Sequence, residues 1–158
     1  MAGFRVLLWR IARPLARLYW RVRRPLTAGV RAVVFDAEGR VLLVRHTYIA
    51  GWYLPGGGVE RGETMLASLR RELDEEAGVM MRGEARLAGL YANFREFKSD
   101  HVALYVLDHG AYEQVPRKSP EIAEAGFFAV DALPEGTSAS TRRRIAEIAE
   151  GRAPDELW

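Results

Sequence analysis

Three glutamates, Glu72, Glu75 and Glu76, lie close together near the middle of the chain. Their spacing of i, i+3 and i+4 places them on one face if the segment is helical. Like charges at that spacing repel one another and destabilise a helix. A divalent cation bound by all three would remove the repulsion, and carboxylate oxygens suit hard cations such as Mg²⁺, Mn²⁺ or Ca²⁺. The spacing therefore indicates a metal site on a helix, and the alternative is a solvent-exposed acidic face.

The segment around these glutamates predicts the helix itself. Thr64 is a good N-cap residue, and Gly78 suits the left-handed position that follows the last turn of a helix. We expect a helix over residues 65–77, with the glutamates beside its buried stripe. The residues of that stripe recur at helical spacing and are Leu66, Leu69, Leu73 and Ala77.

The pattern extends from Gly57 to Val79 and reads GGVERGETMLASLRRELDEEAGV. It resembles the Nudix box, the motif of hydrolases that use a divalent metal to cleave a nucleoside diphosphate linked to another group. The resemblance implies an α+β fold, a Nudix-type α/β/α sandwich with a mixed sheet. It also implies a nucleotide-type small-molecule substrate, hydrolysis of a phosphoanhydride bond, and Mg²⁺ as cofactor, for which Mn²⁺ can substitute.

The same resemblance implies roles for residues of the box. Metal ligands would be Glu72, Glu75 and Glu76, with the carbonyl of Gly57 as a further ligand. Arg71 stands four residues before Glu75, so it can pair with that carboxylate and hold its orientation. We expect Arg71 to act by positioning a metal ligand.

The general base stays open between two regions of the chain. Glu75 of the box is one candidate. Glu121 and Glu124 are the others, because they lie in a segment just before a predicted strand. Such loops often lie over the site in the family that the chain resembles. An ordinary surface position is the alternative for both.

The sequence gives only weak signals for residues that contact the substrate. Arg45 follows an apolar strand and could reach a phosphate, and the alternative is a solvated strand end. Tyr48 and Trp52 could stack on a base, since aromatic faces tolerate any base, and the alternative is core packing. The leaving group stays open between nucleotide sugars, ADP-ribose, dinucleotides and nucleoside triphosphates.

Length and composition fit one domain, which we place at residues 26–158 of the 158-residue chain. The chain has no cysteine, which excludes disulfides and thiolate metal sites. Residues 36–158 carry 15 basic and 21 acidic side chains, a formal charge of −6. We therefore expect no stable nucleic-acid binding by this domain.

Residues 1–25 predict a separate basic, amphipathic helical arm. Residues 1–35 contain eight arginines and no acidic residue, and over residues 4–24 most of the arginines line one helical face. Three alternatives stay open for the arm. It lies on an anionic membrane surface, it docks on its own domain or pairs two subunits as a homodimer, or it is simply a structural helix. No transmembrane span or ordinary signal segment is present, so we expect a cytoplasmic protein, peripheral to the membrane if the first alternative holds.

Hydrophobic periodicity and turn residues predict the remaining strands and one more helix. Residues 29–36 and 41–46 predict two strands joined by a turn, which together form a hairpin. Further strands are expected at residues 85–95, 101–108 and 125–130. A C-terminal helix is expected over residues 138–150, with Ser138 or Ser140 as its cap.

Overall fold

The computed structural model describes residues 26–95 and 99–158. The predicted arm, with its membrane-surface and homodimer alternatives, lies outside the described residues. In chain order the elements are β1 (Thr27–Val34), β2 (Val41–His46), α2 (Met65–Ala77), β3 (Val79–Met81), β4 (Arg86–Ala92), β5 (Asp100–Leu107), β6 (Tyr112–Gln114), β7 (Ile122–Phe128) and α3 (Ala139–Ala149).

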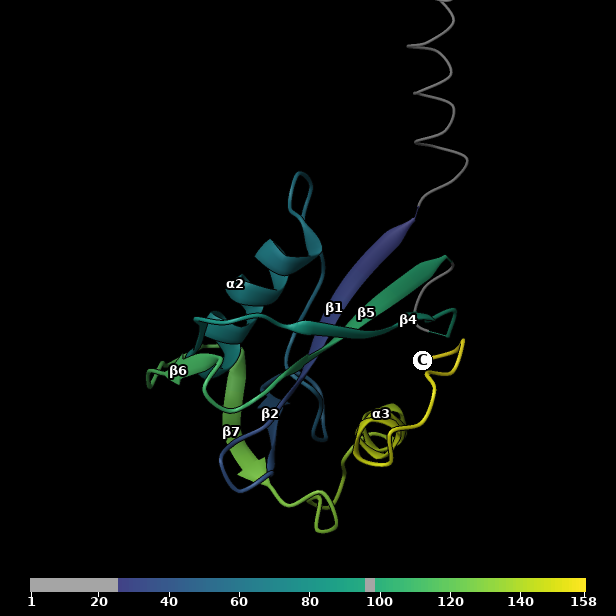
Figure 1. Cartoon of the computed structure of the whole chain (residues 1–158). Coiled ribbons are helices and arrows are strands. Elements are labelled where there is room, and N and C mark those ends of the chain that lie inside the picture. Colours follow the sequence, from purple (N-terminus) through teal and green to yellow (C-terminus); the bar gives the residue numbers. More distant parts are fainter. Residues whose placement is uncertain (1–25, 96–98) are drawn as a thin grey trace, which may run out of the picture.

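A central sheet separates two helices (Figure 1). Its strand order is β1-β5-β4, with β1 parallel and β4 antiparallel to β5. On one face, Val30 and Ala32 of β1 join a buried cluster with Leu69 and Leu73 of α2. On the other face, Val33 joins a second buried cluster that contains Ile145 of α3. The predicted α/β/α arrangement with a mixed sheet is confirmed.

The predicted hairpin between β1 and β2 is wrong as a pair of strands. The turn closes with a single bridge between Phe35 and Val41, and the two strands then enter different sheets. β1 pairs with β5, and β2 pairs with β7. Adjacent residues on both strands are fully buried, so each strand needs cover on both faces, which a two-stranded hairpin alone does not supply.

The predicted helix over residues 65–77 is confirmed as α2. The Thr64 side chain accepts a hydrogen bond from the Ala67 N–H, and Gly78 has a left-handed backbone with φ 63°. Leu69 and Leu73 are buried as expected, but Leu66 is 37% exposed, so its place in the core stripe is wrong. Ser68 is buried in the first part of the helix instead, where its hydroxyl donates to the Gly58 carbonyl at 3.0 Å.

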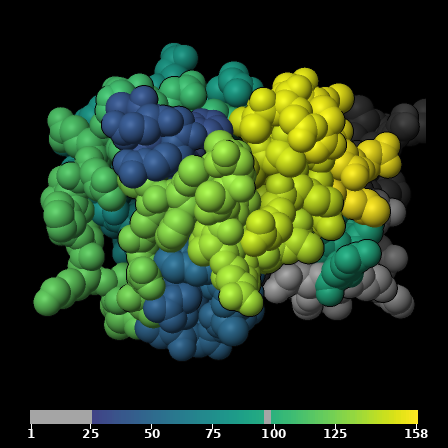
Figure 2. Space-filling view, turned by 90° about the horizontal axis from the view of Figure 1, so that it is seen from below, coloured from purple at the N-terminus to yellow at the C-terminus, as the bar shows by residue number. Residues whose placement is uncertain are grey.

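The other predicted strands and the C-terminal helix are present as β4, β5, β7 and α3. Ser138 caps α3 by accepting from the Thr141 N–H. β3 and β6 were not predicted; they are three-residue strands that, within the described ranges, pair only with each other. The space-filling view in Figure 2 shows α3 and the segment that follows it, in yellow, beside the connection that follows β7. None of the helices in the described ranges is long and apolar enough to cross a membrane.

Candidate active site

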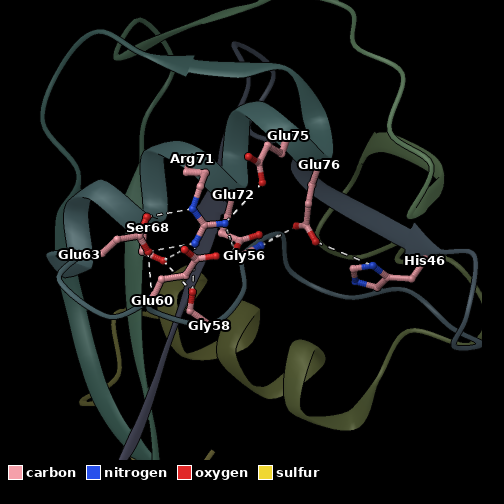
Figure 3. Close-up of polar contacts among 10 residues, drawn as sticks. All are labelled: His46, Gly56, Gly58, Glu60, Glu63, Ser68, Arg71, Glu72, Glu75 and Glu76. Atoms are coloured by element: carbon pink, nitrogen blue, oxygen red, sulfur yellow. Dashed lines mark hydrogen bonds and ion pairs between the residues drawn. The ribbon is translucent and has the colours of Figure 1, made fainter.

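The three glutamates project from one face of α2 (Figure 3). The side chains of Glu72 and Glu76 are 14% and 11% exposed, whereas that of Glu75 is 60% exposed. Glu76 Oε2 accepts a hydrogen bond of 2.7 Å from the Gly56 N–H. The helix therefore presents two shielded carboxylates and one open carboxylate next to the glycine turn that precedes it.

Arg71 links these carboxylates to the start of the helix. Its Nε and Nη2 donate to the two oxygens of Glu63 at 2.9 and 3.0 Å. Its Nη1 donates to Glu72 at 2.7 Å and to Glu75 at 3.4 Å. Its Nη2 also donates to the Gly58 carbonyl at 3.2 Å. The planar guanidinium thus fixes the turn and two of the glutamates at once.

Glu63 is expected to titrate far below an ordinary glutamate. The Arg71 side chain, helped by the Glu60 N–H, lowers the pKa of Glu63 to about 2. Because the native pKa lies below the unfolded one, Glu63 stabilises the fold above about pH 4.5, and that contribution is lost as the pH falls toward 2. A carboxyl NMR titration should give a midpoint near 2 for Glu63, rising toward about 4.5 in Arg71→Gln. Arg70→Gln, the exposed neighbour, is the control; an ordinary midpoint in the wild type would contradict the pairing.

Glu76 lies deepest in the group. Burial raises the pKa of Glu76 to about 7, against the lowering effects of the Gly56 N–H and of Arg31. Its Oε1 lies 3.8 Å from Nδ1 of His46, which is 8% exposed (Figure 3). That Nδ1 has no hydrogen-bond partner among the described residues. A buried carboxylate with a raised pKa is the kind of group that a cation would stabilise in its charged form.

The donor chemistry fits a hard divalent cation. The group offers oxygen ligands and no sulfur, and Gly57 has no Cβ to obstruct Glu72, whose carboxylate lies where that Cβ would be. The Gly57 carbonyl already accepts from the Val30 N–H at 2.9 Å and has a second lone pair. In the side-chain conformations of residues 26–95 and 99–158, no group of three acidic or histidine side chains is close enough together to hold a metal ion. Glu72 and Glu75 turn toward Arg71 instead.

Gly57→Ala is expected to weaken metal binding about tenfold without unfolding the protein. The added Cβ would occupy the space of the Glu72 carboxylate, so this flexible side chain must move away. Titration with Mn²⁺, followed by electron paramagnetic resonance, measures the change. Gly58→Ala is the matched control, because its Cβ would meet nothing within 4 Å. Equal affinities in the two variants would contradict the assignment of Gly57 and Glu72 to a metal site.

The candidates for general base separate in space. Burial has the largest effect on both groups: it raises the pKa of Glu76 and lowers the pKa of His46. The negative charge of Glu121 has a smaller effect and raises the pKa of each. Glu124 instead pairs with Arg45 across β2 and β7 at 2.9 Å, and both side chains are exposed. Glu121 therefore lies near the carboxylate group, whereas Glu124 is held in a surface ion pair.

The candidates for substrate contact also separate. Tyr48 is 71% exposed and lies over the His46 ring, with ring centroids 5.1 Å apart. Trp52 is 8% exposed and packs in the core against Phe128, at 4.9 Å between ring centroids. Arg45 is bound to Glu124, as above. Of the three, only Tyr48 lines the cleft next to the glutamates.

This cleft encloses about 530 Å³, a volume within the range of small-molecule sites. Its wall includes Gly57 and Gly58 on the side of the glutamates and the first turn of α3 elsewhere. Sequence reasoning missed several residues that line it, among them Arg31, His46, Asn93 and Trp158. The signal for Arg31 was present as a charge inside an otherwise apolar strand, GVRAVVF.

Comparison with known proteins places this geometry in a family. The NUDIX domain family model matches residues 25–147. A MutT-like protein from Streptomyces ambofaciens is 27% identical over 128 residues, which is 81% of this chain and 80% of the relative. The solved structure of a MutT NUDIX hydrolase from Burkholderia pseudomallei has a TM-score of 0.65 and 25% identity, and the match covers 79% of this chain and 99% of that one.

Other relatives match a shorter segment of the chain at higher sequence identity. An RNA pyrophosphohydrolase from Halorhodospira halophila is 44% identical over 66 residues, which is 42% of this chain and 35% of that protein. This chain therefore aligns with about a third of that relative. The family model, in contrast, spans the central sheet, α2 with the complete glutamate motif, and all of α3 except its last two residues. The chain belongs to the Nudix hydrolase family.

Proposed function

We propose that the protein is a metal-dependent hydrolase that cleaves a phosphoanhydride bond in a nucleoside diphosphate linked to another group. The observation that carries the proposal is the row of Glu72, Glu75 and Glu76 on one helix face, next to a cleft of nucleotide size. Support also comes from relatives named as a MutT-like protein and as RNA pyrophosphohydrolases.

The glutamates of α2 would hold the cation, with the Gly57 carbonyl as a further ligand. Mg²⁺ suits this oxygen-only set, and Mn²⁺ can replace it. When bound, the cation would neutralise and polarise the pyrophosphate and lower the pKa of a bound water. Arg71 keeps Glu72 and Glu75 oriented through its fork of hydrogen bonds, while the Gly56 N–H orients Glu76.

Glu121 is the preferred general base among the three candidates. It lies outside the box and close enough to influence Glu76, and its carboxylate oxygens accept no hydrogen bond from the described residues. Glu75 is the second candidate, because its carboxylate is open and only weakly held by Arg71. Glu124 is the third, and it would have to release Arg45 to act.

Tyr48 is the preferred stacking residue for the substrate, since its exposed ring borders the cleft. Arg45 could reach a phosphate only after leaving Glu124, and Trp52 contributes packing beneath the site. The substrate classes remain nucleotide sugars, ADP-ribose, dinucleotides and nucleoside triphosphates.

A panel of these substrates, with Mg²⁺ or Mn²⁺, tests the proposal. A 5′-triphosphorylated RNA oligonucleotide joins the panel because of the RNA pyrophosphohydrolase relatives. At least one compound should release a phosphate-containing product, and chelation by EDTA should abolish the release. In ¹⁸O-water the label should enter a phosphate group. Label only on carbon, or no metal-dependent release from any compound, would overturn the proposal.

A further inference from the structure

Arg31 occupies an unusual position for a charged residue. It lies on β1 between Val30 and Ala32, both fully buried against the α2 side of the sheet. Successive side chains of a strand point to opposite faces, so Arg31 faces the α3 side together with Val33. There its side chain lines the cleft.

The backbone around Arg31 ties it to the glutamate group. The Val30 N–H donates to the Gly57 carbonyl at 2.9 Å, and the Ala32 N–H donates to the Pro55 carbonyl at 3.0 Å. These two bonds bracket Arg31, and Gly56 between them donates to Glu76. The strand thus fixes Arg31 where the cleft meets the metal-binding face of α2.

The guanidinium has no partner of its own among the described residues. It forms no hydrogen bond or ion pair there, and its Nη1 is shielded from solvent. Arg144, the fully buried arginine, has in contrast a carboxylate and a carbonyl as partners. The carboxylate of Glu76 acts on Arg31 only through space. A shielded donor without an acceptor is costly, so the position of Arg31 favours an anion that arrives from outside.

The charged residues that line the cleft favour the binding of an anion. The lining also includes His46, whose buried Nδ1 has no hydrogen-bond partner among the described residues and faces Glu76 Oε1 at 3.8 Å. The acidic residue of the cleft, Asp100, is already held by Thr27 at 2.7 Å and by Asn93 at 2.9 Å. Two further arginines, Arg95 and Arg143, also line the cleft, so its lining carries more positive than negative charge and attracts an anionic group. Of the three arginines, Arg31 is the one that lies next to the glutamates of α2.

We propose that Arg31 is a specificity-determining residue that binds the phosphate remaining on the nucleoside when the phosphoanhydride is cleaved. The inference rests on the proposed function and names the substrate contact of the same site. The guanidinium fork matches phosphate oxygens in geometry and charge. Arg31 thereby makes a 5′-phosphate a required part of the ligand, with the sugar and base extending along the cleft.

Binding measurements with products test this assignment without turnover. The four common nucleosides and their 5′-monophosphates are titrated by calorimetry into the full chain, with Mg²⁺ present. The wild type should bind at least one monophosphate about 10- to 100-fold more tightly than its nucleoside, the range expected of a charge-assisted contact. Arg31→Gln should reduce that ratio to near 1, and Arg31→Lys, which keeps charge without the fork, should give an intermediate ratio.

Arg82→Gln is the matched control, since Arg82 is an exposed arginine paired with Glu113 on the β3–β6 sheet. It removes the same net charge and should keep the wild-type ratio. If Arg31→Gln does not fold, as judged by circular dichroism, the Arg31→Lys ratio decides. A wild type that binds neither nucleosides nor monophosphates, or a ratio unchanged in the folded Arg31 variants, overturns the inference.

The hydrolase function and the phosphate contact of Arg31 can be disproved independently of each other. Monophosphate binding that depends on Arg31, with no hydrolysis of any substrate in the panel, would overturn the proposed function and keep this contact. Hydrolysis by the wild type with an unchanged KM in Arg31→Gln would overturn the Arg31 contact and keep the proposed function. The contact predicts that KM for a hydrolysed substrate rises at least tenfold in Arg31→Gln.

Discussion

Glu72→Gln and Glu76→Gln are each expected to lower turnover with Mg²⁺ by at least about 100-fold, which corresponds to about 2.7 kcal/mol in the barrier. Each substitution removes one charged oxygen ligand and keeps the side-chain shape. Glutamine at position 76 can still accept the Gly56 hydrogen bond, so the local geometry should persist. Steady-state assays on the best substrate of the panel measure the loss.

The fold should survive these substitutions. Glu72 and Glu76 lie one turn apart, and their repulsion ends when either becomes neutral. The melting temperature of metal-free Glu76→Gln should therefore be at or above that of the wild type. Glu72→Gln also weakens the 2.7 Å ion pair with Arg71, so it should remain folded without a gain in stability. In both variants the affinity for Mn²⁺ should fall. Glu113→Gln, on the exposed surface of β6, is the matched control and should retain turnover. Full activity in both Glu72→Gln and Glu76→Gln would remove the basis of the metal assignment.

The sequence predicts α2 well because its signals are local. Thr64 and Gly78 define the ends by capping and by a left-handed backbone, and Leu69 and Leu73 define the buried stripe. Leu66 was misplaced because periodicity identifies a face of the helix but does not show how far along the helix that face is covered. At the start of the helix, the inward position belongs to Ser68, which binds the glycine turn.

The pairing of strands is less accessible to sequence reasoning because it depends on residues far apart in the chain. β1 and β2 are joined by a turn with good local signals, yet each pairs with a strand more than 60 residues later. β3 and β6 each have three residues and exist only because they meet. Such short segments carry no period that a single sequence can show.

The residues of the site also differ in whether local sequence signals predict them. The spacing of Glu72, Glu75 and Glu76 was visible because a single helix presents all three. Arg31 and His46 come from two strands in different sheets, so their approach to Glu76 follows only from the assembled fold. Trp52 shows the converse problem, because an aromatic residue near a motif serves the core as readily as a ligand.

Arg144→Met is expected to destabilise the protein by about 3–5 kcal/mol, the usual cost of leaving a buried charge without its partner. Arg144 is fully buried, and its Nη2 donates to Glu147 at 2.6 Å. Its Nη1 donates to the Leu157 carbonyl at 2.8 Å, and its guanidinium lies 4.4 Å from the ring centroid of Tyr91. Among the described residues, the substitution leaves the carboxylate of the 5%-exposed Glu147 with only the Tyr91 hydroxyl as a partner. Thermal unfolding should shift down by about 10 °C.

The charge explanation is tested by removing both partners. The double variant Arg144→Met/Glu147→Leu leaves no unpaired charge, so it should recover much of the lost stability. Arg152→Gln is the surface control, because Arg152 and Glu150 form an exposed pair that contributes at most about 1 kcal/mol. Denaturant unfolding gives all three values on one scale. If the double variant is as unstable as Arg144→Met, then Arg144 stabilises the fold through packing on Tyr91 and the Leu157 carbonyl. In that case α3 is held to the sheet by contacts of the guanidinium plane, independently of its counter-ion.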